Sequence, residues 1–522
     1  FIITTFREMM GSKPSLTLEL DSHSADAGIN TRLDAFIDII HNNRKAIKIE
    51  TNESVLNYKI CGLETKDGLG YINSPDGKQI SLNSPNVKLL IPSMGDLAAP
   101  LFSAALRSLG YNAIGLPVAT HKTLQLGRSV STGKECLPLI LMVGGLIEWM
   151  ENEWNGSDYV VFFNVQGAGN CRLGQYPVFL RHLIRRKKWD KVAQMTLMNE
   201  DGFAGFGEDF AVRGIQAIMA SDILDDVRSG IMTLAKDPEN GLSYFNSQFS
   251  ELVGIMQDKP KYFIEALKVF AQRIKQNIPI EKSIEDADYV AILGEIYVRR
   301  DGFSHKWLNR YFAKHGFIAK IAYITEWIFY VDYLIDKHLL EPEESFRNKV
   351  ERKIRHNYMK RLEKKIKNIM TKSGYYKYEG NHIKKIINNS THIIPLDYKG
   401  EPGIVLGGTL THGLTDYAGI INIGPFACMP TRITEAVVLP ELTLEGKGKA
   451  LKNTDPYFTM SDYWNGKMHI PFLTIETDGN PFPQIVEAKL ETFILQAKRA
   501  SRLMKQNSKK NRGINKLILE KN

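Results

Sequence analysis

From Val87 onward, short apolar runs typical of strands alternate with segments that have the residue spacing of amphipathic helices. Parallel strands need a crossover connection, which a helix usually supplies, so this alternation indicates a parallel sheet covered by helices. The chain is therefore predicted to be an α/β protein. In the first stretch we expect strands at 87–91, 113–116, 159–164 and 192–198, and helices at 97–109, 137–149 and 176–186.

A second stretch with the same alternation follows a segment, 210–278, that loses its strands and becomes mostly helical. Its expected strands are 289–296, 318–323, 393–395, 420–423 and 472–475, and its expected helices are 306–315, 411–418, 432–439 and 484–499. We therefore predict two similar Rossmann-like or flavodoxin-like parallel-sheet domains with a helical insertion.

The residues before the first of these strands have a different character. An expected helix at 6–10, a strand at 15–20 and a helix at 33–40 precede a region at 51–84 that is rich in Gly, Asn and Asp, as connecting hairpins are. Because the chain starts in helix and strand without an initiator Met, we expect the remnant of a truncated upstream α/β domain. The predicted divisions are 1–85 for this remnant and the hairpin region, 86–205 for the first α/β domain, 206–285 for the insertion, 286–500 for the second α/β domain, and 501–522 for a basic tail that we expect to be disordered.

Composition is that of a soluble protein from a reducing compartment. The 522 residues are 43% hydrophobic, and the four cysteines are too few for a disulfide framework. No apolar run reaches the length of about eighteen residues that a membrane span needs, and the start lacks the basic region and cleavage site of a signal peptide. We therefore expect a cytoplasmic protein with no membrane partner.

The net charge of +9 is concentrated in the segment 347–372 and in the tail from Lys498 onward. Within 346–372, apolar residues fall near helical spacing with basic residues between them, which is typical of the solvated face of a packed helix. An acidic protein partner or an anionic ligand such as CoA is the alternative reading of this basic helix. Neither basic segment is convincing as a nucleic-acid site.

Three of the four cysteines, Cys136, Cys171 and Cys428, share one local setting, because each follows a glycine-containing loop and precedes a predicted helix. A sulfur at a helix N-terminus lies near unpaired N–H groups and the positive end of the dipole, so we expect a lowered pKa and a thiolate that binds soft metals. Three thiolates without a fourth suit a [4Fe–4S] cluster with one iron left for an external ligand, whereas structural zinc favours close cysteine pairs. Buried inert cysteines, zinc and a redox thiol stay open as alternatives. Cys61 lacks this setting and is expected to be structural.

Signals for other chemistries are weak. The glycine-rich segment 403–409 lacks dinucleotide-binding spacing, and the chain contains no phosphate-binding GxxxxGK(S/T) loop. It also contains no HExxH or GxSxG motif. His23 has acidic neighbours, but such residues in a loop after a strand more often cap helices than bind a metal. We therefore expect no ATPase activity from the chain alone, and whether it is an enzyme stays open.

Six segments along the chain form a more specific set. They are SLTLELDSHSADAG at 15–28 with Thr31-Arg32, GKECLP at 133–138, CRLGQY at 171–176, GEIYVR at 294–299, GPFACMP at 424–430 and DGNP at 478–481. Together they resemble the C-terminal region of large CoA-substrate-specific enzyme activases. That family is related to 2-hydroxyacyl-CoA dehydratases, benzoyl-CoA reductases and double-cubane cluster proteins, and the resemblance covers nearly the whole chain.

The resemblance implies α/β domains whose cysteines, here Cys136, Cys171 and Cys428, hold a [4Fe–4S] cubane that receives low-potential electrons in an ATP-dependent way. In related proteins two cubanes can join into a double-cubane cluster. This sequence lacks the sugar-kinase-like ATP-binding domains and the upstream cysteine set of the large proteins. ATP would therefore act only through a partner or a missing domain, and a second cubane would come from missing sequence or another subunit, with a homodimer as one arrangement.

The leading hypothesis is an iron–sulfur component of an ATP-dependent electron-transfer system, acting as an activase-linked reductase or a 2-hydroxyacyl-CoA dehydratase-like protein on an acyl-CoA or other small molecule. Arg172 and Gln175, one and four residues beyond Cys171, are candidates for tuning the cluster. Glu135 is a candidate for proton transfer or for repelling anions. The rival hypothesis is a non-catalytic scaffold or regulatory subunit that docks an ATP-driven activase through the basic helix.

Overall fold

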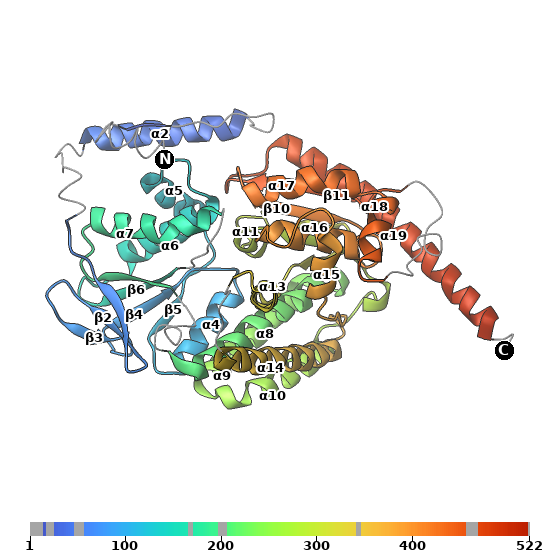
Figure 1. Cartoon of the computed structure of the whole chain (residues 1–522), viewed down its shortest axis with the longest axis horizontal. Coiled ribbons are helices and arrows are strands. Elements are labelled where there is room, and N and C mark those ends of the chain that lie inside the picture. The colour runs from blue at the N-terminus through green and yellow to red at the C-terminus, as the bar shows by residue number, and fades with distance from the viewer. Residues whose placement is uncertain are drawn as a thin grey trace.

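The computed structural model describes residues 14–16, 26–45, 57–164, 171–196, 206–340, 346–455 and 468–519. Two four-stranded sheets and a group of long helices make up most of it (Figure 1). The helix and strand expected at 6–10 and 15–20 lie outside the described residues, apart from 15–16, which form neither helix nor strand.

The first sheet is parallel throughout, with strand order β5-β4-β6-β7. Its strands are β4 (Val87–Ile91), β5 (Ala113–Gly115), β6 (Tyr159–Asn164) and β7 (Val192–Thr196). The accompanying helices are α4 (Ala98–Arg107), α5 (His121–Val130), α6 (Leu137–Asn152) and α7 (Tyr176–Arg186). Most residues of β4 and β6 are buried, as expected for inner strands covered by helices on both faces.

The second sheet is also parallel, with order β11-β10-β8-β9. Its strands are β8 (Asp288–Gly294), β9 (Phe317–Ile321), β10 (Ile420–Pro425) and β11 (Phe472–Thr477). The helices of this unit include α11 (Ile296–Arg300), α12 (Leu308–Lys314), α13 (Ile324–Asp336), α15 (Ile383–Ser390), α16 (Glu401–His412), α17 (Met429–Val438), α18 (Leu444–Lys452) and α19 (Gln484–Leu519).

The two units have the same topology. When the strands of each unit are numbered along the chain, both sheets have the flavodoxin-like order 2-1-3-4, so each has a switch point between its first and third strands. Each unit also has a close helix pair before its third strand, α5 with α6 and α15 with α16. Gly144 and Gly407 allow this close packing, because a Cβ atom would lie only 2.0 Å from the Thr123 carbonyl oxygen and 1.9 Å from the Ile386 carbonyl oxygen, respectively. The predicted α/β class with two similar parallel-sheet units is confirmed.

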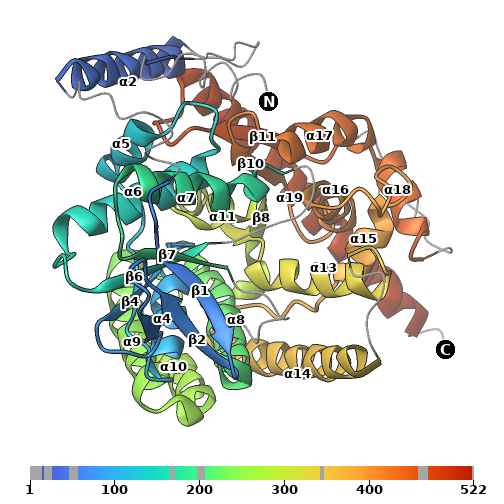
Figure 2. The same cartoon turned by 60° about the vertical axis from the view of Figure 1, so that its left-hand side comes forward.

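A helical layer beside both sheets is built from the insertion helices α8 (Gly207–Leu234), α9 (Pro238–Asp258) and α10 (Phe263–Asn277), together with α14 (Phe346–Met370) from the second unit (Figures 1 and 2). On α14 the basic residues expected on a solvated face are mostly exposed, whereas Arg352 and Lys367 are buried. Of its apolar positions, Met359 and Ile366 are buried, but Ile354 is 66% exposed. The basic helix is therefore a packed helix with one charged, solvated face.

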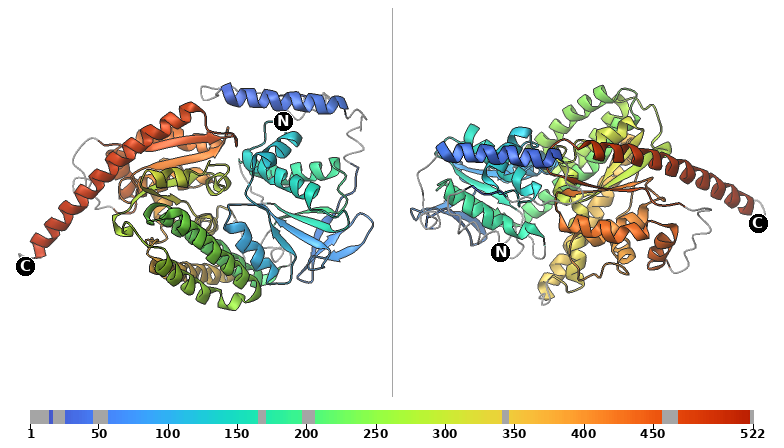
Figure 3. Two further views of the ribbon diagram at one scale, coloured as in Figure 1. Left: turned by 180° about the vertical axis from the view of Figure 1, so that it is seen from behind. Right: turned by 90° about the horizontal axis from the view of Figure 1, so that it is seen from above.

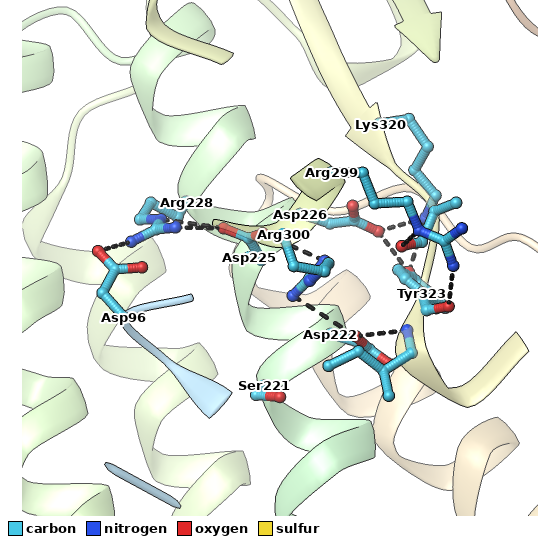
Figure 4. A network of polar contacts seen from close by, with 12 residues as sticks. Asp96, Ser221, Asp222, Asp225, Asp226, Arg228, Arg299, Arg300, Lys320 and Tyr323 are labelled. Carbon is cyan, nitrogen blue, oxygen red and sulfur yellow. Dashed lines mark hydrogen bonds and ion pairs between the residues drawn. The ribbon is translucent and has the colours of Figure 1, made fainter. Parts of the chain in front are cut away.

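Ion pairs on α8 join the helical layer to both sheet units. Arg228 pairs with Asp96, which follows β4, at 2.6 Å. Arg300, at the end of α11, pairs with Asp222 and Asp225 of α8 at 3.4 and 3.2 Å, and all three side chains are almost fully buried (Figure 4). Removing one partner of such a buried pair is strongly destabilising, so α8 acts as a fixed cross-link between the two units.

Several local predictions were wrong. Residues 393–395 form a turn rather than a strand, and the helix expected at 411–418 is α16, which ends at His412. The tail, which we expected to be disordered, is helical and extends α19 as far as Leu519. Figure 3 shows this helix extending away from the sheets. Two other predictions are confirmed. The hairpin region expected at 51–84 contains, in its described part, a three-stranded antiparallel sheet of β1 (Gly62–Lys66), β2 (Leu69–Asn73) and β3 (Gln79–Ser81), and the helix expected at 33–40 lies within α2 (Asp26–Lys45). Among the described residues, no helix has both the length and the apolar character to cross a membrane.

Lys447, a buried lysine of the second unit, allows the packing of that unit to be tested. Lys447 on α18 is 0% exposed, and its ammonium donates to the Leu410 and Thr411 carbonyl oxygens at the end of α16 at 2.9 and 3.0 Å. Burial lowers the pKa of Lys447 to about 7. The unfolded state therefore binds more protons than the folded state between about pH 7 and the ordinary lysine pKa of about 10.4, so stability should rise with pH across this window.

We predict that Lys447→Met abolishes this rise. Relative to the variant, the wild type should gain stability from pH 7 to pH 10 at a rate of at most about 1.4 kcal/mol per pH unit. Urea denaturation at several pH values measures it, with the exposed neighbour Lys449→Met as the matched control. Parallel pH profiles for wild type and Lys447→Met would contradict the assignment.

Candidate metal centre

Three cysteines begin helical segments, as the sequence predicts. Cys136 is the N-cap residue of α6, and Cys428 is that of α17. Cys171 is the N-cap of a short 3₁₀ helix, Arg172–Gln175, which runs directly into α7, and its sulfur accepts a hydrogen bond from the Leu173 N–H at 3.5 Å.

One guanidinium group joins the segments that carry all three cysteines. Arg172, next to Cys171, donates to the carbonyl oxygen of Lys134 at 2.9 Å. It also donates to the carbonyl oxygens of Phe426 and Ala427, both at 3.0 Å. Lys134 lies two residues before Cys136, and Ala427 immediately precedes Cys428. The three loops, although Cys136 and Cys428 are 292 residues apart in the sequence (428 − 136), therefore meet at Arg172.

The repeated topology explains this meeting. Cys171 follows β6 and Cys428 follows β10, the third strands of their units, so both lie beyond the carboxyl end of a strand at a switch point. Cys136 begins α6, the second helix of the α5–α6 pair. In the other unit the corresponding helix is α16. Its N-cap, which matches Cys136, is Gly400, and its first helical residue is Glu401. The candidate centre thus combines three cysteines with a carboxyl group one residue after the position that corresponds to Cys136.

Burial, rather than the helix dipole, controls the thiols. Cys136 and Cys428 are buried, and burial raises the pKa of Cys136 to about 11 and that of Cys428 to about 12. Burial also raises the pKa of Cys171, although its residue surface is exposed. The expectation of lowered thiol pKa values was therefore wrong for the protein without a metal, because removal from water outweighs the favourable helix N-terminus.

Two carboxyl groups, the buried Glu401 and the partly exposed Glu295, lie close to the thiols. Glu295 caps α11 by accepting from the Val298 N–H at 2.8 Å, and Glu401 accepts from the Ile296 N–H at 2.8 Å. Burial, followed by the charge of Glu295, raises the pKa of Glu401 to about 8. Both carboxylates also contribute to raising the pKa values of Cys171 and Cys428, after burial. Sequence reasoning missed Glu401, because no motif connects it to a cysteine 27 residues later in the chain.

The loops are shaped by local contacts. Ala427 has a φ of 57°, a left-handed conformation unusual for a residue with a Cβ atom, directly before Cys428. Glu135 accepts from the N–H and the hydroxyl of Thr132 at 2.7 and 2.9 Å, so it closes the loop before Cys136. Tyr176, which sequence reasoning did not single out, forms a hydrogen bond between its hydroxyl and the Cys136 sulfur at 2.7 Å.

A cavity of about 80 Å³ adjoins these loops. Its lining includes Arg32, Arg128 and Arg172, together with Glu135 and Asp478. The Arg128 guanidinium donates to the Asp478 carbonyl oxygen at 2.8 Å, and the guanidinium carbon of Arg32 lies 4.5 Å from the Phe426 ring centroid. Cations therefore outnumber carboxylates in the lining, which favours an anionic or strongly polar small molecule.

Of the other residues considered in the sequence analysis, Cys61 lies apart from the candidate centre and Gln175 makes no distinctive contact. The Cys61 thiol donates to the Asp190 carbonyl oxygen at 3.0 Å and packs in the core around β1 to β4, as expected for a structural residue. Gln175 has an exposed side chain, so its predicted role stays a prediction.

The structure leaves the kind of metal centre open. Among the described residues, no three His, Cys, Asp or Glu side chains are grouped so that they could hold one metal ion. The distances between the three sulfurs, and the cluster that they would bind, stay predictions.

Comparisons with known proteins add no family. No protein-family model matches the chain, and a search of curated proteins gives no match.

The central role of Arg172 can be tested by stability. We predict that Arg172→Ala destabilises the protein by about 1–3 kcal/mol, because three partly buried carbonyl oxygens lose their charged donor. Chemical denaturation measures the change, and Arg181→Ala, at an exposed position of α7, is the matched control. Equal stability of the two variants would contradict the role of Arg172 in joining the loops.

Proposed function

We propose that Cys136, Cys171 and Cys428 hold a [4Fe–4S] cluster, and that the chain is the iron–sulfur component of an ATP-dependent low-potential electron-transfer system in the cytoplasm. The observation that carries this proposal is the meeting of all three cysteine-bearing loops at the Arg172 guanidinium. Inert cysteines would not require three distant loops to be joined around one cation. The six motifs that resemble CoA-substrate-specific activases support the same function.

The residues around the thiols have separable tasks in this proposal. The cluster would supply one-electron chemistry at low potential. Arg172 holds the three loops in register and offers positive charge beside the sulfurs. The arginine-lined cavity next to the loops, at about 80 Å³, is where a small anionic group of a substrate, such as part of an acyl-CoA or of another small molecule, would bind. Tyr176 and the surrounding apolar residues restrict access of water to Cys136.

Activity as an activase-linked reductase or a dehydratase-like protein follows from this combination of a cluster with a neighbouring cavity. ATP hydrolysis belongs to a separate or fused activase in this proposal, because the sequence has no recognisable phosphate-binding glycine loop.

We predict that anaerobic reconstitution gives a brown protein with about four iron and four sulfide ions per chain. Cys171→Ser should lose most of this iron, because serine is a poor ligand for iron in such a cluster and the chain offers no spare cysteine in the same loops. Cys61→Ser should retain the iron and serves as the control. Iron and sulfide analysis measures the outcome.

Equal iron content in Cys171→Ser and Cys61→Ser would contradict the cysteine assignment. A wild-type protein that stays colourless after reconstitution would favour the second candidate, a non-catalytic scaffold or regulatory subunit.

The observation that favours the second candidate is the exposed basic face of α14, which includes Lys360, Arg361, Lys364 and Lys365. This face would also serve the first candidate as the docking surface for an activase. We predict that replacing these four residues by Glu weakens activase binding at least tenfold and makes the residual binding less sensitive to salt, because exposed charges are screened over about 10 Å at 0.1 M salt.

Binding titrations at two salt concentrations measure this effect. A variant with the same change of charge at dispersed exposed positions, Lys122, Lys187, Lys314 and Lys489, is the matched control. Unchanged binding of the α14 variant, or an equal loss in both variants, would contradict docking at the basic helix.

A further inference from the structure

A second polar cavity lies in the second unit, away from the cysteine loops. It has a volume of about 90 Å³ and is bounded by β8, β9 and the helices α13, α14, α15 and α16. Its charged and titratable lining residues are Arg299, Lys320, Glu326, Glu363, Lys367, Glu379, His382 and His412, with Tyr323 and Tyr417 among them. A buried water needs about 10–15 Å³, so the cavity has room for only a few non-hydrogen atoms.

The cations of this cavity already have partners. Lys320 is bound by Asp226 and by the Tyr323 hydroxyl, and it lies 3.4 Å from a Glu379 oxygen. Figure 4 shows Lys320, Tyr323 and Asp226 as one end of the ion network that α8 supports. This wall is therefore held in place before any ligand binds.

Lys367 and Arg299, the other two cations of the lining, also have partners within the protein. Lys367 pairs with Glu363 at 2.8 Å and donates to the Glu379 carbonyl oxygen at 2.9 Å. The Arg299 guanidinium donates hydrogen bonds to backbone carbonyl oxygens, among them those of Gly294 and Tyr323 at 2.6 and 3.0 Å. An anionic ligand would find no uncommitted cation in this lining.

The acceptor groups, in contrast, have unused capacity. Among the described residues, no hydrogen bond or ion pair is found for the Glu326 carboxyl group, although it lines the cavity. His412 uses only Nδ1, which lies 2.8 Å from an Asp416 oxygen, and this leaves Nε2 available. The His382 ring lies 5.7 Å from the His412 ring, and His382 is exposed, which places it at the mouth of the cavity.

The charged groups in and behind the lining also bear on which ligand the cavity can bind. The three cations Arg299, Lys320 and Lys367 face the carboxyl groups of Glu326, Glu363 and Glu379, and Asp226 lies directly behind Lys320. Within the lining itself the carboxyl groups and the cations are equal in number, and Asp226 behind Lys320 gives the carboxyl groups a surplus of one. Burial raises the pKa of Glu326, although the nearby charge of Arg299 acts against the rise.

We propose that this cavity binds a small organic cation with one primary ammonium group, which donates hydrogen bonds to Glu326 and to the available nitrogens of His382 and His412. The ammonium group supplies the missing positive charge and three donors, matching acceptors that the protein leaves unused. The size of the cavity limits the rest of the ligand to a short chain. This site is independent of the proposed cluster.

The proposal is tested on the full chain with three probes of similar size: propylammonium, the neutral propan-1-ol and the anionic propionate. Calorimetric titration and thermal unfolding should show saturable binding and stabilisation with propylammonium alone. Glu326→Gln should weaken propylammonium binding at least tenfold, and Glu326→Asp, which retains the charge, should weaken it less. Glu487→Gln, at an exposed position of α19, should bind as the wild type does.

Three results would overturn the proposal. They are equal stabilisation by propan-1-ol or propionate, binding of propylammonium that is unchanged in Glu326→Gln, and no binding of propylammonium by a wild-type protein with the expected far-UV circular dichroism. Circular dichroism of each variant separates loss of binding from loss of folding.

Discussion

The candidate centre depends on the three hydrogen bonds that Arg172 donates to backbone carbonyl oxygens. Two of these oxygens, in Phe426 and Ala427, belong to the second unit, and the third, in Lys134, belongs to the first unit. A charged donor forms stronger hydrogen bonds than a neutral one, and a guanidinium has enough N–H groups in a fixed fork to bind several acceptors at once. The positions of Cys136 and Cys428 relative to each other therefore follow from the side chain that is next to Cys171.

The duplicated 2-1-3-4 topology makes this arrangement possible. Two sheets of the same order each present a loop after the third strand, and the ion pairs of α8 with Asp96 and Arg300 connect both units to one rigid helix. The second unit differs in the position that corresponds to Cys136, which is Gly400, followed by Glu401 as the first residue of α16. The asymmetry of an otherwise repeated structure is thus concentrated at the candidate centre, as expected where function has modified a fold.

The sequence predicted the α/β class, the repeated units and the helix that follows each of the three cysteines, because these depend on local periodicity and on loop residues. The predictions from sequence failed at positions whose structure depends on tertiary contacts. The 393–395 segment forms a turn that ends at Pro395, which cannot donate an N–H to a neighbouring strand, and α16 tolerates its glycines because Gly407 permits contact with α15. The thiol pKa values were mispredicted because burial is a property of the whole fold. Glu401 and the cavity beside Glu326 join residues from distant segments, which no local pattern reveals.

The most direct test of the central claim is Mössbauer spectroscopy of the anaerobically reconstituted protein. Because three irons of the proposed cubane each receive one cysteine and the fourth receives an external ligand, the account predicts a spectrum of a [4Fe–4S] cluster in which one iron site differs from the other three. A spectrum of mononuclear iron, or of a cluster with four equivalent iron sites, would contradict it.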